Sequence, residues 1–140
     1  LDDLVLAEAR RLRERGPHLN ISVVSAARVL GQRSSLDRVA RNLLDNAARH
    51  AATTVTVQLT STEDLVRLIV RDDGPGIADA DRERVFDRFT RLDDARSTDQ
   101  GGAGLGLAIV RDVVRSYGGQ VTITDNNPGA VFTVTLPAAP

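Results

Sequence analysis

The sequence predicts an α+β fold, a two-layer sandwich in which one mixed, mostly antiparallel sheet of about five strands packs against three helices. Two observations support this class. Apolar residues recur at helical spacing in three stretches, and they alternate with polar residues in shorter stretches between them. With 140 residues the chain can build one hydrophobic core but is short for two ordinary domains, so we expect a single domain over residues 1–140.

Helical spacing marks three segments, which are residues 4–12, 34–51 and 105–117. Gly16–Pro17 should end the first helix and Gly118–Gly119 the third. Ser34 or Ser35 is expected to cap the long middle helix, because a hydroxyl can accept a hydrogen bond from the first free backbone amides. A further short helix is predicted at residues 80–86.

Alternation of apolar and polar residues predicts strands, at residues 19–23, 55–59, 65–70, 121–124 and 130–136. Residues 65–70 are more continuously apolar, so the antiparallel hairpin that they form with residues 55–59 should lie at the centre of the sheet. Residues 27–30 are a candidate for another strand. The last two strands should form a hairpin closed around Asn126–Gly129.

The charge balance argues against nucleic acid as a partner, because 18 basic and 19 acidic residues leave a net charge of −1. All of the basic residues are arginine, and a chain without lysine cannot contain a Walker A loop or a lysine-anchored kinase site. Cysteine is absent, which excludes disulfides and thiolate chemistry. The two histidines, His18 and His50, are too far apart in sequence to indicate a transition-metal site.

The chain contains no methionine and no apolar stretch of the ~20 residues that a membrane span needs. No signal-peptide pattern opens it. We therefore expect a piece of a larger protein that does not itself contact a membrane.

The middle helix carries polar residues on one face. Asn42 and Asn46 are four residues apart, and Arg49 and His50 follow one turn later. Asparagine is a mediocre helix former, so a pair on one face suggests a function. Either the face is simply solvated, or the amide oxygen of Asn46 ligates Mg²⁺ while waters complete the octahedron.

The segment Asp72–Ile77 reads Asp-Asp-Gly-Pro-Gly-Ile and directly follows an apolar strand. Gly74 and Gly76 permit a sharp turn and the close approach of a flat ligand. A carboxylate at the strand end can accept a hydrogen bond from the adenine N6 amine and repel the oxygen that guanine presents there. The alternative is a plain Asp-Gly turn.

A glycine-rich loop, residues 101–107, opens the last helix, and its backbone amides suit a polyphosphate. A Rossmann dinucleotide site does not fit, because the third glycine is replaced by Leu107 and the loop follows no strand.

Residues 87–104, which overlap the start of this loop, are polar and have no predicted structure of their own, which indicates a functional lid. Phe86 and Phe89 should anchor its hinge in the core. Arg91 and Arg96 are either phosphate ligands on this lid or ordinary solvated side chains.

Together and in this order, these segments resemble the ATP-binding catalytic domain of bacterial sensor histidine kinases, in the Bergerat-fold superfamily that includes gyrase, MutL-type and heat-shock chaperone ATPases. Residues 42–47 resemble the N box of that family, 72–77 its G1 box, 85–89 its F box and 102–107 its G2 box. The likeness spans essentially the whole chain. It implies a domain of two-component signal transduction that uses ATP and Mg²⁺, with a long ATP lid at about residues 87–104.

The resemblance also implies individual roles. Asn46 would carry Mg²⁺, with Asn42 in the same polar network, and Asp72 would bind the adenine. Arg49 would lie beside the phosphates and His50 beside the base.

The lid positions Arg91, Arg96 and Gln100 match residues that touch the γ-phosphate in some family members. The expected catalytic residues are Asn42, Asn46, Arg91 and Arg96. The full set expected to bind the nucleotide is Asn42, Asn46, Arg49, His50, Asp72, Gly74, Gly76, Ile77, Arg91, Arg96, Gln100, Gly102, Gly104, Leu105, Gly106 and Leu107.

One position separates the sub-families. ATP-hydrolysing relatives carry a glutamate base four residues before the magnesium asparagine, where this chain has Asn42, which cannot act as a general base. The implied function is to bind Mg–ATP and present its γ-phosphoryl group to a histidine on a separate dimerisation and phosphoacceptor domain. Neither His18 nor His50 has the sequence context of an acceptor, so the fragment alone should not autophosphorylate. Ala103 replaces the usual Thr or Ser of the G2 box and removes one hydroxyl contact to phosphate.

Two other functions remain open. One is a serine kinase of the anti-sigma-factor type, which shares the fold and differs in its acceptor. The other is a degenerate nucleotide-binding module whose lid no longer closes. The histidine-kinase likeness further implies a response regulator downstream and a cytoplasmic domain whose parent is anchored in the bacterial membrane.

Overall fold

The computed structural model describes residues 1–14, 18–24, 26–87 and 106–140 of the chain. Its α-helices are α1 (Asp2–Arg13), α2 (Arg33–His50) and α3 (Gly106–Ser116). Its strands are β1 (His18–Val24), β2 (Thr54–Ser61), β3 (Leu65–Asp72), β4 (Gln120–Asp125) and β5 (Ala130–Pro137). Two 3-10 helices, η1 (Asp79–Asp81) and η2 (Arg84–Phe86), lie between β3 and α3.

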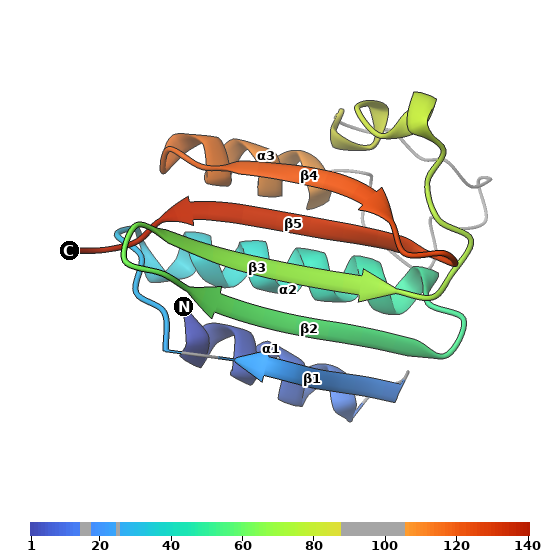
Figure 1. Ribbon diagram of the computed structural model, residues 1–140, viewed down its shortest axis with the longest axis horizontal. Helices are drawn as coiled ribbons and strands as arrows, with labels where there is room; N and C mark the ends of the chain where they lie inside the picture. The colour runs from blue at the N-terminus through green and yellow to red at the C-terminus, as the bar shows by residue number, and fades with distance from the viewer. Residues whose placement is uncertain (15–17, 25, 88–105) are drawn as a thin grey trace.

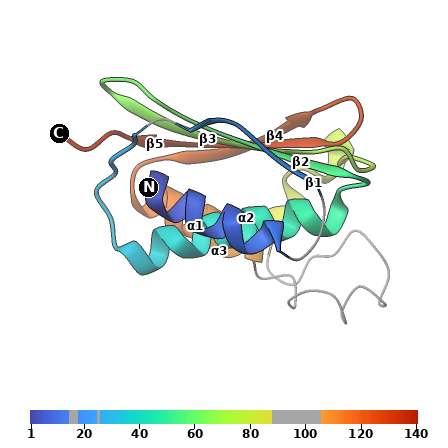
Figure 2. The same cartoon turned by 90° about the horizontal axis from the view of Figure 1, so that it is seen from below.

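In the described part of the chain the strands form one sheet in the order β1-β2-β3-β5-β4 (Figure 1). β1 pairs with β2 in parallel, and the other three pairs are antiparallel. α1, α2 and α3 all lie on one face of this sheet (Figure 2). The predicted fold class is therefore confirmed, including the mixed sheet and the central position of β3. None of the described helices combines the length and apolar character that crossing a membrane requires.

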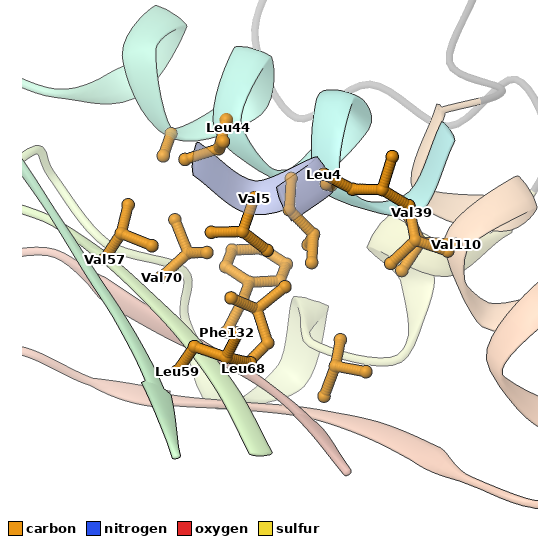
Figure 3. Packing of buried hydrophobic residues seen from close by; sticks show 14 of the residues in the cluster. Leu4, Val5, Val39, Leu44, Val57, Leu59, Leu68, Val70, Val110 and Phe132 are labelled. Carbon is orange, nitrogen blue, oxygen red and sulfur yellow. The ribbon is translucent and has the colours of Figure 1, made fainter. Parts of the chain in front are cut away.

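The core lies between the sheet and the helix layer (Figure 3). Alternate strand residues face inward, so Val55, Val57 and Leu59 of β2 are fully buried while their neighbours are partly exposed. Phe132 of β5 is 1 % exposed and pairs with Val70 of β3. Burial of a side chain of this size stabilises the fold by about 1.5–3 kcal/mol.

The start of α2 differs from the prediction. Ser34 and Ser35 lie inside the first turn, and the N-cap is Gln32, whose side chain makes no capping hydrogen bond. The Gln32 carbonyl accepts the first helical hydrogen bond from Leu36 at 3.1 Å, and its own backbone amide donates to the Tyr117 hydroxyl at 2.9 Å. A distant tyrosine therefore fixes the residue at which the helix begins.

The candidate strand at residues 27–30 is wrong, since this segment belongs to no strand of the sheet. Its backbone is paired instead with the two ends of the chain. The terminal amine of Leu1 donates to the Ala27 carbonyl at 2.9 Å, and the Ala139 amide donates to the Arg28 carbonyl at 2.8 Å.

The single short helix predicted at residues 80–86 is also wrong, because the structure has η1 and η2 there. η1 has no buried residue, whereas η2 buries Val85 and Phe86. A continuous helix would have little apolar surface to bury along its first turn, and short helices depend on such packing.

Candidate functional site

Helix α2 contacts two other chain segments that carry predicted site residues. Its middle contacts the first residue of α3, and its carboxyl end contacts the loop after β3. The Asn42 side-chain amide donates to the Gly106 carbonyl at 3.2 Å, which joins α2 to α3. Gly74 packs on the backbone carbonyl of His50, which joins the β3 loop to the end of α2.

The polar face of α2 is not simply solvated. Asn46 is only 6 % exposed, and within the described residues its side chain has no hydrogen-bond partner. Buried amides are normally paired, so an unpaired one is suited to a ligand. An amide oxygen is a ligand that Mg²⁺ accepts, and the chemistry of Asn46 therefore fits the ion. Arg49 is exposed and His50 is half-buried on the last turn of the same helix.

Asp72 is the last residue of β3 and is 3 % exposed. Its Oδ1 accepts a hydrogen bond of 2.9 Å from the Gly74 backbone amide. Burial raises the pKa of the Asp72 carboxyl above its ordinary value, although hydrogen bonds from the Gly74 and Ala130 backbone and the nearby His50 act in the opposite direction. The strand end thus presents a desolvated carboxyl group, which interacts strongly with a hydrogen-bond donor.

The Asp73 carboxylate makes structural contacts that were not predicted from the sequence. Its carboxylate accepts hydrogen bonds from the backbone amides of Thr53 and Thr54, at 2.9 and 3.0 Å, and from the Thr53 hydroxyl at 2.5 Å. The Thr53 hydroxyl and these backbone amides hold the pKa of Asp73 far below its usual range. Asp73 therefore fastens the α2–β2 connection to the β3 loop, while Asp72 faces the interior.

The glycines of the β3 loop are required by contacts within the protein. A side chain at Gly74 would overlap the His50 carbonyl oxygen. Gly76 has φ of +79°, a conformation that favours glycine, and Ile77 beyond it packs against the core. The prediction that Gly74 and Gly76 allow a flat ligand to approach remains a prediction, but their packing gives each an independent reason to be glycine.

The start of α3 supplies the remaining described site residues. Gly106 accepts the Asn42 hydrogen bond, and Leu107 is half-buried against the core. The other predicted positions lie outside the described residues, and they are Phe89, Arg91, Arg96, Gln100, Gly102, Gly104 and Leu105.

Arg111 of α3 was missed by the sequence reasoning. Its guanidinium carbon lies 5.1 Å from the centre of the Phe86 ring, and its nitrogens reach Glu83 at 3.1 Å and Asp87 at 3.7 Å. Phe86 in turn meets Phe132 edge-on, with ring centres 6.5 Å apart. Arg111 thus fastens α3 to the segment around η2. Its sequence neighbourhood is an ordinary amphipathic helix and carries no signal of this contact.

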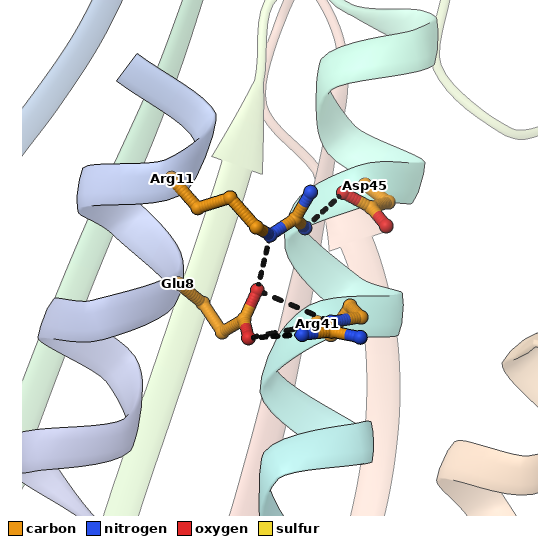
Figure 4. Close-up of polar contacts among 4 residues, drawn as sticks. All are labelled: Glu8, Arg11, Arg41 and Asp45. Atoms are coloured by element: carbon orange, nitrogen blue, oxygen red, sulfur yellow. Dashed lines mark hydrogen bonds and ion pairs between the residues drawn. The ribbon is translucent and has the colours of Figure 1, made fainter. Parts of the chain in front are cut away.

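A charged cluster behind the site was missed as well (Figure 4). Glu8 of α1 is 4 % exposed and accepts hydrogen bonds from Arg11, at 2.7 Å, and from Arg41 of α2, at 3.2 Å. Arg11 also donates to Asp45 at 2.6 Å. Burial raises the pKa of Glu8, but the hydrogen bonds from the two arginines outweigh it, so the net shift is downward. The cluster attaches α1 to the part of α2 that carries Asn42 and Asn46.

Comparisons with family models, curated proteins and solved structures agree on one family. Residues 31–140 match the family described as histidine kinase-, DNA gyrase B- and HSP90-like ATPases. The chain is 40% identical, over 147 aligned residues, to the signal transduction histidine-protein kinase/phosphatase MprB of Mycobacterium sp. strain KMS, and the match covers 99% of this chain and 28% of MprB. The chain spans about a quarter of the length of the curated relatives it matches.

Two solved structures are similar over 99% of the chain. The mycobacterial sensor histidine kinase MprB aligns with a TM-score of 0.85 and 32% identity, and 94% of that structure is covered. Full-length ShkA in complex with AMPPNP aligns with a TM-score of 0.81 and 30% identity, and 30% of that structure is covered.

Proposed function

The chain belongs to the family of histidine kinase-, DNA gyrase B- and HSP90-like ATPases, as a catalytic ATPase domain of the sensor histidine kinase type, and on this premise we propose how it works. The domain binds Mg–ATP and presents the γ-phosphoryl group to a histidine on a separate dimerisation and phosphoacceptor domain of the same parent protein. A response regulator then acts downstream in two-component signal transduction. The domain lies in the cytoplasm, and its parent is anchored in the bacterial membrane.

The observation that carries this proposal is the buried Asn46 side chain, which has no partner among the described residues and lies on the same helix as Asn42. Asn46 would hold Mg²⁺ through its amide oxygen, and the ion would neutralise charge on the phosphates. At the other end of the nucleotide, the Asp72 carboxylate accepts a hydrogen bond from the adenine N6 amine. Arg49 is exposed on the last turn of the helix that carries Asn46, and it would reach the phosphates.

Asn42 explains why transfer is favoured over hydrolysis. Its amide donates to the Gly106 carbonyl, and an amide cannot remove a proton from water. Position 42 therefore offers bound ATP no general base. Phosphoryl transfer depends mainly on positioning and charge neutralisation, so a nucleophile delivered by another domain is sufficient. Arg91 and Arg96 are proposed to complete the charge neutralisation around the γ-phosphate.

The experiment mixes this domain with γ-labelled ATP, Mg²⁺ and a helical phosphoacceptor domain, and follows the label. We expect acid-labile label on a histidine of the acceptor domain and none on this chain. Asn46→Ala should abolish labelling, while Asn20→Ala, which changes an exposed asparagine of β1, should leave it intact.

Other outcomes of this labelling experiment would identify the competing functions. Acid-stable label, typical of phosphoserine, would indicate a serine kinase of the anti-sigma-factor type. Absence of both labelling and ATP binding would indicate a degenerate module.

A further inference from the structure

The turn between β4 and β5 contacts the main chain of Asp72 from the side opposite β2. The Asn126 side-chain amide donates a hydrogen bond of 2.8 Å to the Asp72 carbonyl oxygen. Gly129 of the same turn packs so closely on this carbonyl that a side chain at position 129 would overlap it. The turn thus reaches directly to the residue that is proposed to bind adenine.

Asn126 takes the place of a missing strand partner. The β3–β5 ladder ends at the pair Arg71–Val131, and Asp72 lies one residue beyond it. Asp72 is 3 % exposed, so little water is available to satisfy its carbonyl group. The side chain of Asn126 supplies the hydrogen bond that β5 no longer provides.

The turn is itself held on both sides. The Asn126 backbone amide donates to the Gly129 carbonyl at 3.0 Å, which closes the turn. Asp125 accepts from Arg82 at 2.5 Å, and the same guanidinium donates to the Ile77 carbonyl at 3.3 Å. The turn is therefore tied to Asp72 and Ile77, the first and last residues of the Asp72–Ile77 loop.

We propose that Asn126 is a positioning residue for base recognition, which fixes the Asp72 backbone and thereby aims the Asp72 carboxyl group at the N6 amine of the purine. This inference rests on the proposed function, in which Asp72 binds adenine. Asn126 does not touch the nucleotide and acts only through Asp72. A residue that merely stabilised the hairpin would instead affect all nucleotides equally.

The test compares ATP with purine riboside triphosphate, which has the same sugar and phosphates but no N6 amine. Affinities are measured by calorimetry with Mg²⁺ for the wild-type domain and for Asn126→Ala and Asn126→Asp. The wild type should prefer ATP by about 10- to 100-fold, the range for a hydrogen bond to a charged group. In both variants this preference should fall toward one, with little loss of affinity for purine riboside triphosphate.

Asn127→Asp is the matched control. Asn127 is the exposed neighbour in the turn, with a left-handed φ of 49°, which aspartate tolerates. This variant makes the same chemical change one residue away and should keep the preference of the wild type. Asn126→Ser, which retains a donor, should recover part of the preference and provides a second variant if Asn126→Asp does not fold.

The outcomes separate the inference from its premise. A wild type that binds both nucleotides equally overturns the adenine role of Asp72 and this inference with it. A wild-type preference that survives intact in Asn126→Ala overturns the inference alone. Equal losses for both nucleotides in that variant also overturn it, because they indicate a structural role.

Discussion

Asn42 and Gly106 are joined by a hydrogen bond of 3.2 Å from the side-chain amide to the carbonyl oxygen, across 64 residues of sequence. The bond connects α2 to the first residue of α3. The amide in this bond belongs to Asn42, which occupies the position where ATP-hydrolysing relatives are expected to carry their general base. Asn42 therefore has a structural function beside the catalytic one proposed for it.

Replacement of Asn42 by aspartate should weaken this connection, because a carboxylate would face a carbonyl oxygen with no donor between them. We expect Asn42→Asp to lower the free energy of unfolding by about 1–3 kcal/mol, the cost of an unsatisfied polar group in a partly buried position. Urea denaturation measures this value. The control is Asn20→Asp on the exposed edge strand, and equal stability of the two variants would contradict the assignment.

The variant Asp72→Asn should weaken ATP binding without lowering the stability of the fold. The folded-state pKa of Asp72 is raised by burial, so ionisation of this group disfavours the folded state. Its contribution to stability is complete below the unfolded-state pKa and is lost as pH rises from there through the folded-state pKa. The neutral variant should therefore be at least as stable as the wild type at pH 7. Its affinity for ATP should drop by about 10- to 100-fold.

Calorimetry and urea denaturation at pH 7 check both parts of this expectation. A folded Asp72→Asn variant with unchanged ATP affinity would remove the adenine assignment. Burial raises the pKa of Asp72. On acidification, the ATP affinity of the wild type should therefore begin to fall at a higher pH than it would if the binding residue were an exposed aspartate.

Asp73 should show the opposite pH behaviour. Its folded-state pKa is lowered by hydrogen bonds from Thr53 and Thr54, so its stabilising contribution is complete above the ordinary aspartate pKa and is lost as pH falls below it. Asp73→Asn should be less stable than the wild type at pH 7, and the difference should shrink in acid. Denaturation at pH 7 and pH 3 measures this. Asp64→Asn, in the exposed β2–β3 turn, is the control, and an equal effect at both pH values would be inconsistent with the role given to Asp73.

Arg111 should contribute to stability through Phe86 and the two carboxylates that it contacts. Its side chain is 19% exposed, so the cation–π contact is partly desolvated. We expect Arg111→Ala to lower the free energy of unfolding by about 1–2 kcal/mol and Arg111→Lys to recover part of the loss. Arg115→Ala, on an exposed position of the same helix, should cost much less. Similar losses for positions 111 and 115 would show that the Phe86 contact is unimportant.

Periodicity was enough to predict the three helices, the strands that form the sheet and the hairpin of β2 and β3. Local glycine and asparagine patterns were enough to single out Asn42, Asn46 and Asp72 as candidates. The structure buries Asn46 and Asp72 and joins Asn42 to α3, while their roles toward a nucleotide stay predictions. The roles expected for Arg91 and Arg96 also stay predictions, because both residues lie outside the described part of the chain.

What the sequence could not predict are contacts between residues far apart in the chain. The first residue of α2 is set by Tyr117, and residues 27–30 pair with the two chain ends because those ends lie beside them in the fold. Neither contact leaves a periodic pattern. The same is true of Asn126, whose partner Asp72 precedes it by 54 residues.

The buried carboxylate of Glu8 couples two ion pairs that hold α1 on α2. Arg41 on α2 and Arg11 on α1 both donate to it, and Arg11 also reaches Asp45 on α2. If α1 moved away while the rest of the domain stayed folded, Glu8 would lose Arg41 and Arg11 would lose Asp45, whereas the Glu8–Arg11 pair within α1 would stay intact. A displacement of α1 relative to α2 therefore has to separate two ion pairs at once, and both oppose it.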